Sequence, residues 1–338
     1  MGGDISFIMS ADDLAMISRK HRALRRIREI LAEFEEQFEP MPDVMHIIDQ
    51  KIGQFAQDKQ DDVEQAYNFL HSLETHQCLD NYMARQMEID GQIRSTLIKW
   101  MAEVIQWFDL PDETFFLSVG YVDQFLKRES VPKDNLQLLG VGAMFLADKM
   151  IEEDTNISIH KMAEMLSKPV ATRVNEIAKQ ESQICVTLDF RLLCATPLDF
   201  LSIFKELDDT MPMSKGSRSD VNTSRTREMF HLAVRVAEIG MLTYALWQFS
   251  PSLIASAAWS IAHYIQWRQS KPSGMTGDHI GSESIENSIV SHWPDTLACF
   301  TCYTGQHLKV CATLLLTGYD SVMSQKCLPV IATRKITL

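Results

Sequence analysis

Hydrophobic side chains recur along this chain with the spacing of α-helices. Between Ile93 and Phe108 they are separated by three or four residues, which places them on one face of a helix. Further helical runs are predicted at residues 61–73, 115–128, 157–166 and 170–188, and residues 14–38, rich in Leu, Ala, Arg and Glu without Gly or Pro, predict one more helix. Asp112 is the expected N-cap of the helix that ends near Arg128. No alternating run of useful length is found, so the sequence predicts an all-α fold.

Another predicted helix, opened by Pro132 and Asp134, is apolar on nearly every side. Such a helix belongs in the middle of a bundle, where neighbours cover all of its faces. Gly140 and Gly142 lower its intrinsic helix propensity. We therefore expect a neighbouring helix to approach closely at these two glycines.

An internal duplication relates two parts of the chain. Leu138–Ala147 and Leu253–Ala262 place small and large residues in the same order, at an offset of 115 residues. This offset is too long for a solenoid repeat and predicts two copies of a domain, with a boundary at Ala195–Pro197. The polar segments Met213–Arg227 and Ser270–Asn287 are expected to be surface loops or disordered insertions in the second copy.

Composition and charge narrow the classes of partner. The chain has 338 residues, of which 46% are apolar and 23% charged, as in ordinary globular proteins. Its net charge of -13 opposes binding to nucleic acid, and no such partner is expected. Residues 19–28 form a basic stretch, which is read as a solvated helix face in preference to a nuclear-import or nucleic-acid signal.

Seven cysteines at irregular spacing, without an apolar leader, favour a reducing compartment. Cys299, Cys302, His307 and Cys311 could be read as a zinc site. They also fit packed helices, and this reading is favoured because a second pair of ligands at structural-site spacing is missing. No metal or cofactor is expected.

The longest apolar stretch, Leu253–Trp267, contains serines and a histidine and is shorter than a membrane span. It is expected to be a buried helix, and no membrane span is predicted. Met1 and Gly2, followed by Ser6, fit the loose pattern for N-myristoylation, but short patterns of this kind often match by chance.

Two charged residues interrupt apolar helix faces. Lys149 shares a face with Gly142 and Phe145, and Glu181 shares one with Ile177 and Ile184. An unpaired charge is expensive to bury. The two residues could pair with each other, lie at the margin of the core, or meet a docking partner, and their spacing alone favours the structural alternatives.

Arg94 and Asp123 present a similar pattern, on the helix at 93–108 and on the next helix respectively. A structural ion pair that joins these helices is the simplest explanation.

Five residues resemble the hallmark positions of the cyclin box: Arg94, Leu97, Asp123, Lys149 and Glu181. Their surroundings, including Ile93–Val104 and Tyr121–Leu126, are similar to mitotic A- and B-type cyclins. The resemblance extends over about residues 61–325, through Tyr82 and Met83 before the first box and Ser250–Ala255 in the second.

The resemblance implies two tandem five-helix cyclin boxes with an N-terminal helical extension. The expected units are residues 1–60 (extension), 61–194 (first box with its lead-in helix), 195–325 (second box) and 326–338 (tail).

The resemblance also implies a non-catalytic protein that binds and activates a cyclin-dependent kinase. Lys149 and Glu181 would contact the kinase, with apolar area from Phe145, Ile184 and Leu188. The second copy has Tyr264 at the place of Lys149, so the first box alone is expected to make this contact.

Cyclins also dock substrates or inhibitors that carry an Arg-x-Leu motif. The residues that match this docking patch are Ile93, Thr96, Leu97, Trp100, Glu103, Leu136 and Gln137. Thr96 replaces a larger aliphatic residue. Arg28–Leu31 fits part of a degradation signal but falls in a predicted helix, where it would be poorly exposed.

A mitotic cyclin would act in the nucleus and cytoplasm at the transition from G2 to mitosis. The alternatives are a cyclin-fold regulator or scaffold of transcription and an enzyme. The sequence contains no Gly-rich phosphate loop, His-Glu-x-x-His pair or nucleophile elbow, which argues against an independent active site.

Overall fold

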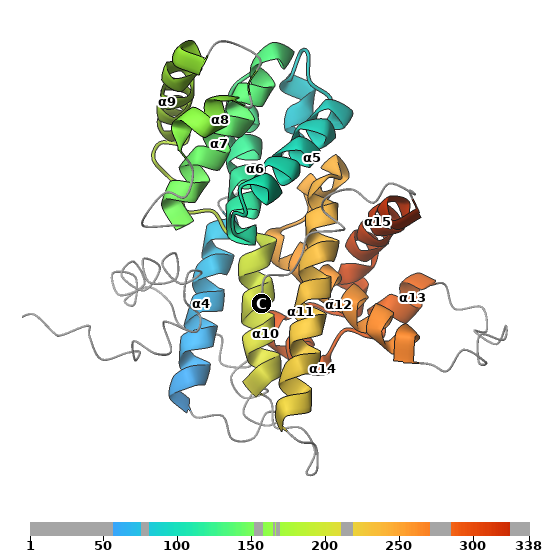
Figure 1. The fold of residues 1–338 in the computed structure, drawn as a ribbon. Coiled ribbons are helices and arrows are strands. Elements are labelled where there is room, and N and C mark those ends of the chain that lie inside the picture. Colours follow the sequence, from blue (N-terminus) through green and yellow to red (C-terminus); the bar gives the residue numbers. More distant parts are fainter. Residues whose placement is uncertain are drawn as a thin grey trace, which may run out of the picture.

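The computed structural model describes residues 57–75, 81–151, 158–164, 166, 170–210, 219–270 and 285–324 (Figure 1). The regular elements of these ranges are helices, and no strand occurs among them, which confirms the all-α prediction. The helix predicted at 14–38, Gly2 and Arg28–Leu31 lie outside the described residues.

The helices form two bundles. The first bundle contains α5 (Gly91–Trp107), α6 (Asp112–Arg128), α7 (Leu136–Ile151), α8 (Ile159–Glu164) and α9 (Val170–Thr187). The second bundle contains α10 (Pro197–Thr210), α11 (Ser219–Met241), α12 (Pro251–Ser270), α13 (Ile285–Val290), α14 (Asp295–Thr301) and α15 (Gly305–Ser324). Helix α4 (Gln57–Thr75) precedes both, and short 3-10 helices are found at η3 (Tyr82–Arg85), η4 (Lys133–Asn135) and η5 (Tyr244–Gln248).

Helix α7 is the centre of the first bundle, where it packs against α5, α6 and α9. The two glycines explain how its neighbours come so close. A Cβ atom would lie 3.0 Å from Leu97 Cδ1 at Gly140 and 2.9 Å from Gln180 Cγ at Gly142. The predicted close approach is therefore confirmed, on α5 at the first glycine and on α9 at the second.

Helix α12 has the same central place in the second bundle, between α10, α11 and α15. Two of its buried serines donate to backbone carbonyls, one within α12 and one in α13. Ser256 donates to the Ser252 carbonyl at 2.8 Å, and Ser260 donates to the Ile289 carbonyl at 2.7 Å. The apolar stretch from Leu253 is thus a buried helix, as predicted.

Two local predictions are wrong. Helix α11 begins at Ser219, inside the polar segment that was expected to be a loop. The buried Thr226 donates to Asp208 of α10 at 2.9 Å, so this end of the segment is held against a neighbouring helix. In α6, Asp112 is the first helical residue and Pro111 is the N-cap. Proline suits this turn because the N–H that it lacks would have no partner inside the helix.

Helix α4 precedes the first bundle in the chain but packs against α10 and α12 of the second (Figure 1). Tyr67 anchors it there, with its ring 5.6 Å from that of Phe200 and 4.7 Å from that of Phe300, measured between centroids. In sequence α4 leads into the first unit, whereas in space it covers the second.

Candidate functional site

Lys149 and Glu181 meet at the edge of the first bundle because α7 packs against α9. The Lys149 ammonium lies 2.7 and 2.8 Å from the two Glu181 carboxylate oxygens and 4.2 Å from the centroid of the Phe145 ring. The side chains are 39% and 18% exposed, respectively. The structure thus combines two of the readings left open by the sequence: the charges pair with each other, and they lie at the margin of the core. Their contact with a partner stays a prediction.

The apolar residues expected to support that contact are placed differently from the prediction. Phe145, Ile184 and Leu188 are only 7%, 0% and 2% exposed, so they fill the core beneath the charges and offer little surface to a partner. Helical periodicity identified the face on which they lie, but it does not report how deeply that face is covered.

Exposed apolar side chains occur instead at the C-terminal end of α9, the helix that carries Glu181. Val186 is 64% exposed, and Phe190, just beyond the helix, is 70% exposed. The backbone N–H of Phe190 donates to the carbonyl of Cys185 at 2.8 Å, and its φ of 57° turns the chain sharply. The sequence reasoning missed both residues because they do not belong to the apolar stripe.

The residues of the predicted docking patch lie on two helices that contact each other, α5 and α7. Leu97 and Leu136 are buried, whereas Ile93, Trp100 and Gln137 are partly exposed. Thr96 and Glu103 are exposed. The Thr96 hydroxyl donates to the Gln92 carbonyl at 2.9 Å, so its side chain is engaged with its own helix.

Arg94 and Asp123 form a bidentate ion pair between α5 and α6, with both nitrogen–oxygen distances at 2.7 Å. Tyr82 donates to the same carboxylate at 2.6 Å, and Arg94 also donates to the Met241 carbonyl of the second bundle at 2.9 Å. Burial lowers the pKa of Arg94, but the adjacent Asp123 raises it, and the net shift is upward. Arg94 therefore stays charged and links the two bundles.

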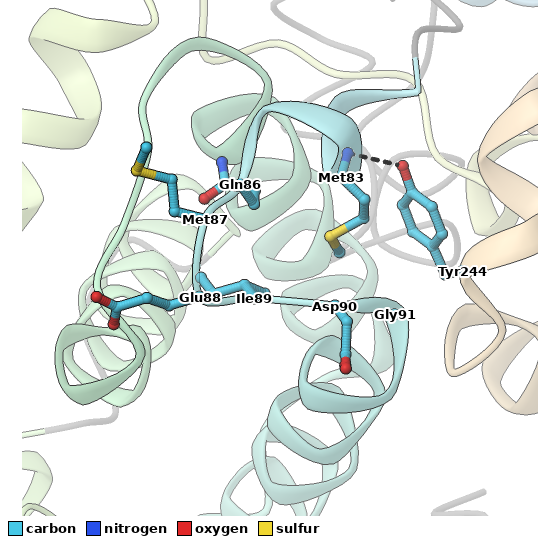
Figure 2. Close-up of a pocket in the computed structure, with 8 residues that line it drawn as sticks. All are labelled: Met83, Gln86, Met87, Glu88, Ile89, Asp90, Gly91 and Tyr244. Atoms are coloured by element: carbon cyan, nitrogen blue, oxygen red, sulfur yellow. Dashed lines mark hydrogen bonds between the residues drawn. The ribbon is translucent and has the colours of Figure 1, made fainter.

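A cavity of about 440 Å³ opens at the same junction (Figure 2). Its lining residues are Met83, Gln86, Met87, Glu88, Ile89, Asp90, Gly91 and Tyr244. The Tyr244 hydroxyl accepts from the Met83 backbone at 3.1 Å and donates to Asn81 at 3.0 Å. Tyr244 thus attaches the segment that enters the first bundle to the second bundle.

Within the described ranges, no group of three or more His, Cys, Asp or Glu side chains could hold a metal ion. In the region of the hypothetical zinc ligands, Cys311 is buried in α15 and Cys302 ends α14 in the left-handed conformation. Among the helices that the structure describes, none has the length and apolar character needed to cross a membrane. Tyr264, at the place of Lys149 in the second copy, is buried.

In comparisons with known proteins, each of the two bundles matches a protein domain family. Residues 65–193 match the cyclin N-terminal domain, and residues 195–331 match the cyclin C-terminal domain. Cyclin-B2-1 of Oryza sativa subsp. japonica is 29% identical over 265 residues, which cover 78% of this chain and 54% of that protein. The G2/mitotic-specific cyclin-B of Dictyostelium discoideum is 34% identical over 232 residues, which cover 69% of this chain and 44% of that protein.

Among solved structures, a viral cyclin from Herpesvirus saimiri has the same fold, with a TM-score of 0.50 and 17% identity. The match covers 74% of this chain and 99% of the viral protein. The chain spans about half the length of the curated relatives it matches first. Since the two domain matches together account for most of its residues, in the order expected for tandem cyclin boxes, the chain belongs to the cyclin family.

Proposed function

We propose that this cyclin binds and activates a cyclin-dependent serine/threonine kinase, and that it does so at the transition from G2 to mitosis. The accessible Lys149–Glu181 pair is the observation that carries the proposal. The second bundle has the buried Tyr264 at the place of Lys149, which favours the first bundle as the docking side. Relatives named as G2/mitotic-specific cyclins support the assignment to this phase.

The chemistry of the pair suits the recognition of a backbone. An ammonium has three donors and a carboxylate has several acceptor positions, so each can bond to a peptide group of a partner in addition to its present partner. The exposed side chains of Val186 and Phe190, at and just beyond the C-terminal end of α9, would add apolar contact area. Docking that favours the active arrangement of the kinase would activate it by a population shift.

Substrates or inhibitors with an Arg-x-Leu motif would dock on the patch formed by α5 and α7, where Glu103 offers an exposed carboxylate to the arginine. We place this activity in the nucleus and cytoplasm, where mitotic kinases of this class would meet their substrates.

The combined substitution of Lys149→Ala and Glu181→Ala tests the proposal. We expect loss of kinase binding in pull-downs and loss of kinase activation in phosphorylation assays. Helical circular dichroism should be retained, because accessible ion pairs contribute only about 0 to 1 kcal/mol to stability. The matched control is Lys161→Ala with Glu164→Ala, an exposed pair of charged residues on α8 that should leave binding unchanged.

Full activation by the Lys149 and Glu181 double variant would refute this contact. If the unaltered chain bound none of a panel of cyclin-dependent kinases, kinase regulation itself would be refuted.

A further inference from the structure

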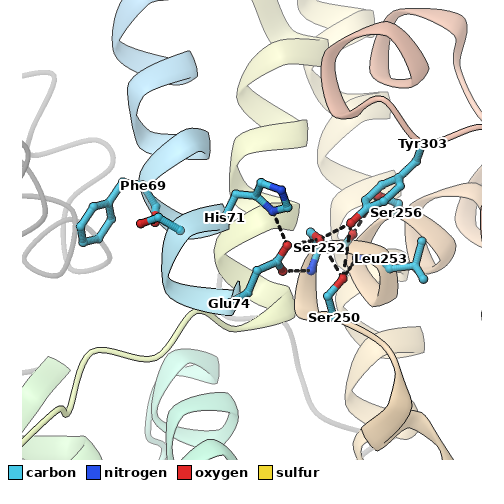
Figure 3. Close-up of polar contacts among 9 residues, drawn as sticks. Phe69, His71, Glu74, Ser250, Ser252, Leu253, Ser256 and Tyr303 are labelled. Carbon is cyan, nitrogen blue, oxygen red and sulfur yellow. Dashed lines mark hydrogen bonds and ion pairs between the residues drawn. The ribbon is translucent and has the colours of Figure 1, made fainter. Parts of the chain in front are cut away.

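A buried carboxylate connects α4 to the second bundle. Glu74 lies near the end of α4, and its side chain is 2% exposed. Its two oxygens accept hydrogen bonds from the Ser252 backbone N–H at 2.9 Å and from the Ser252 hydroxyl at 2.6 Å (Figure 3). The Nδ1 atom of His71, one turn earlier on α4, lies 2.5 Å from the same carboxylate.

The position of Ser252 explains why a carboxylate is favourable here. Ser252 is the second residue of α12, a helix of 20 residues. The first N–H groups of a helix have no partner within it and carry a partial positive charge, which an anion stabilises. The Tyr303 hydroxyl, 2.7 Å from that of Ser252, extends the network to the segment after α14. Glu74 therefore caps the central helix of the second bundle from outside it.

His71 is the group of this cluster that can change charge near neutral pH. Its side chain is 50% exposed, so its proton exchanges with solvent. Tyr67 stacks on its ring within α4, at a centroid distance of 6.0 Å, and α10 contributes Phe200 beside Tyr67. The titratable groups of other elements that act on Tyr67, the ring stacked on His71, are Tyr303 and Cys302. Burial raises the pKa of Tyr303, so it stays neutral.

We infer that Glu74 and His71 form a proton-dependent clasp, in which Glu74 binds Ser252 of the second bundle and protonated His71 offsets the charge of this buried carboxylate. With His71 protonated, its bond to Glu74 is charge-assisted and stronger than the bond made by a neutral ring. Deprotonation weakens that bond but leaves both Ser252 bonds in place. The charge of the buried Glu74 carboxylate is then no longer offset, so its burial becomes less favourable and α4 opens more often from the faces of α10 and α12.

The direction of the pH dependence follows from linkage. The hydrogen bond to Glu74 raises the pKa of His71 above its ordinary value of 6.5, and this outweighs the opposing effect of burial. The stabilisation is therefore complete below pH 6.5 and is lost as the pH rises through the higher pKa of the folded state.

Hydrogen exchange of the full chain, measured by mass spectrometry at pH 6.0 and 8.0 and corrected for intrinsic rates, tests the clasp. In the unaltered protein the opening constant of α4 should rise about threefold over this range, as expected for a partly exposed ion pair. In His71→Gln the constant should no longer depend on pH. Peptides from α6 report global unfolding and should show no comparable change.

Glu74→Gln should raise the opening constant of α4 at both pH values, because it weakens the cap on α12. If this variant does not fold, the unaltered protein and His71→Gln still test the clasp when their α4 opening constants are compared. His71→Gln is expected to fold, since His71 is partly exposed and its replacement leaves the cap intact. An equal pH dependence of α4 in the unaltered protein and in His71→Gln would overturn the inference, as would a pH-independent α4 in the unaltered protein.

Discussion

At the scale of single residues, Arg94 of α5 connects helices of both bundles. It bonds to Asp123 on α6 and to the Met241 carbonyl at the end of α11. Arg94→Ala would leave Asp123 without its charged partner. We expect the free energy of unfolding, measured by urea titration with circular dichroism, to fall by about 3 to 5 kcal/mol.

Lys99→Ala, an exposed change on the same helix, is the control and should stay within about 0.5 kcal/mol of the unaltered protein. Tyr82→Phe removes one bond to Asp123 and should cost about 1 kcal/mol. A loss below 1 kcal/mol for Arg94→Ala would contradict the structural importance of the pair.

The sequence identified several key residues but not all of their surroundings. Lys149, Glu181, Arg94 and Asp123 stood out because each interrupts or adjoins an apolar helix face. The bond between Glu74 and Ser252 could not be predicted, because 178 residues separate them and neither is unusual in its own segment.

At the scale of helices, two glycines distinguish the effect of close helix packing on stability from the effect of intrinsic helix propensity. A Cβ atom on Gly240 of α11 would lie 2.4 Å from Leu315 Cδ2 of α15. On Gly120 of α6 a Cβ atom would have Cys194 Cβ as its nearest neighbour, 4.0 Å away. Gly240→Ala should therefore destabilise the protein by about 1 to 3 kcal/mol through overpacking.

Gly120→Ala should instead stabilise it by about 0.5 to 1 kcal/mol, because alanine is the better helix former. Thermal unfolding of the two variants in parallel measures the contrast. Equal shifts of the two melting temperatures would contradict the close contact between α11 and α15.

Helices with a continuous apolar stripe were the predictable elements. The runs at 93–108 and 170–188 correspond to α5 and α9 to within two residues at each end. The start of α11 was missed because its first turns are polar, and the contact of Thr226 with α10 is not visible in a local pattern.

At the scale of the whole molecule, a partly buried histidine affects stability in acid. Burial, with smaller contributions from Arg225 and His292, lowers the pKa of His263 from 6.5 to about 4. Its Nε2 atom has no hydrogen-bond partner among the described residues. The unfolded chain binds a proton first, so stability present above pH 6.5 is lost as the pH falls towards 4.

Chemical denaturation at pH 7 and pH 4.5 should show this loss, up to about 3 kcal/mol from this residue alone. His263→Leu should reduce the difference between the two pH values. His160→Gln, a change at an exposed histidine of α8, should leave this difference unchanged. An unchanged difference in His263→Leu would show that other groups cause the acid sensitivity.

The packing of α4 against the second bundle has a consequence for folding during translation. Glu74 is translated 178 residues before Ser252, its partner. At about 5 to 20 residues per second, α4 waits roughly 10 to 35 s on the ribosome before its binding surface has been made. During that interval Tyr67, which is buried in the finished protein against Phe200 and Phe300, has no surface of the second bundle to cover it. The nascent chain should therefore depend on chaperones most strongly while the first bundle is already complete.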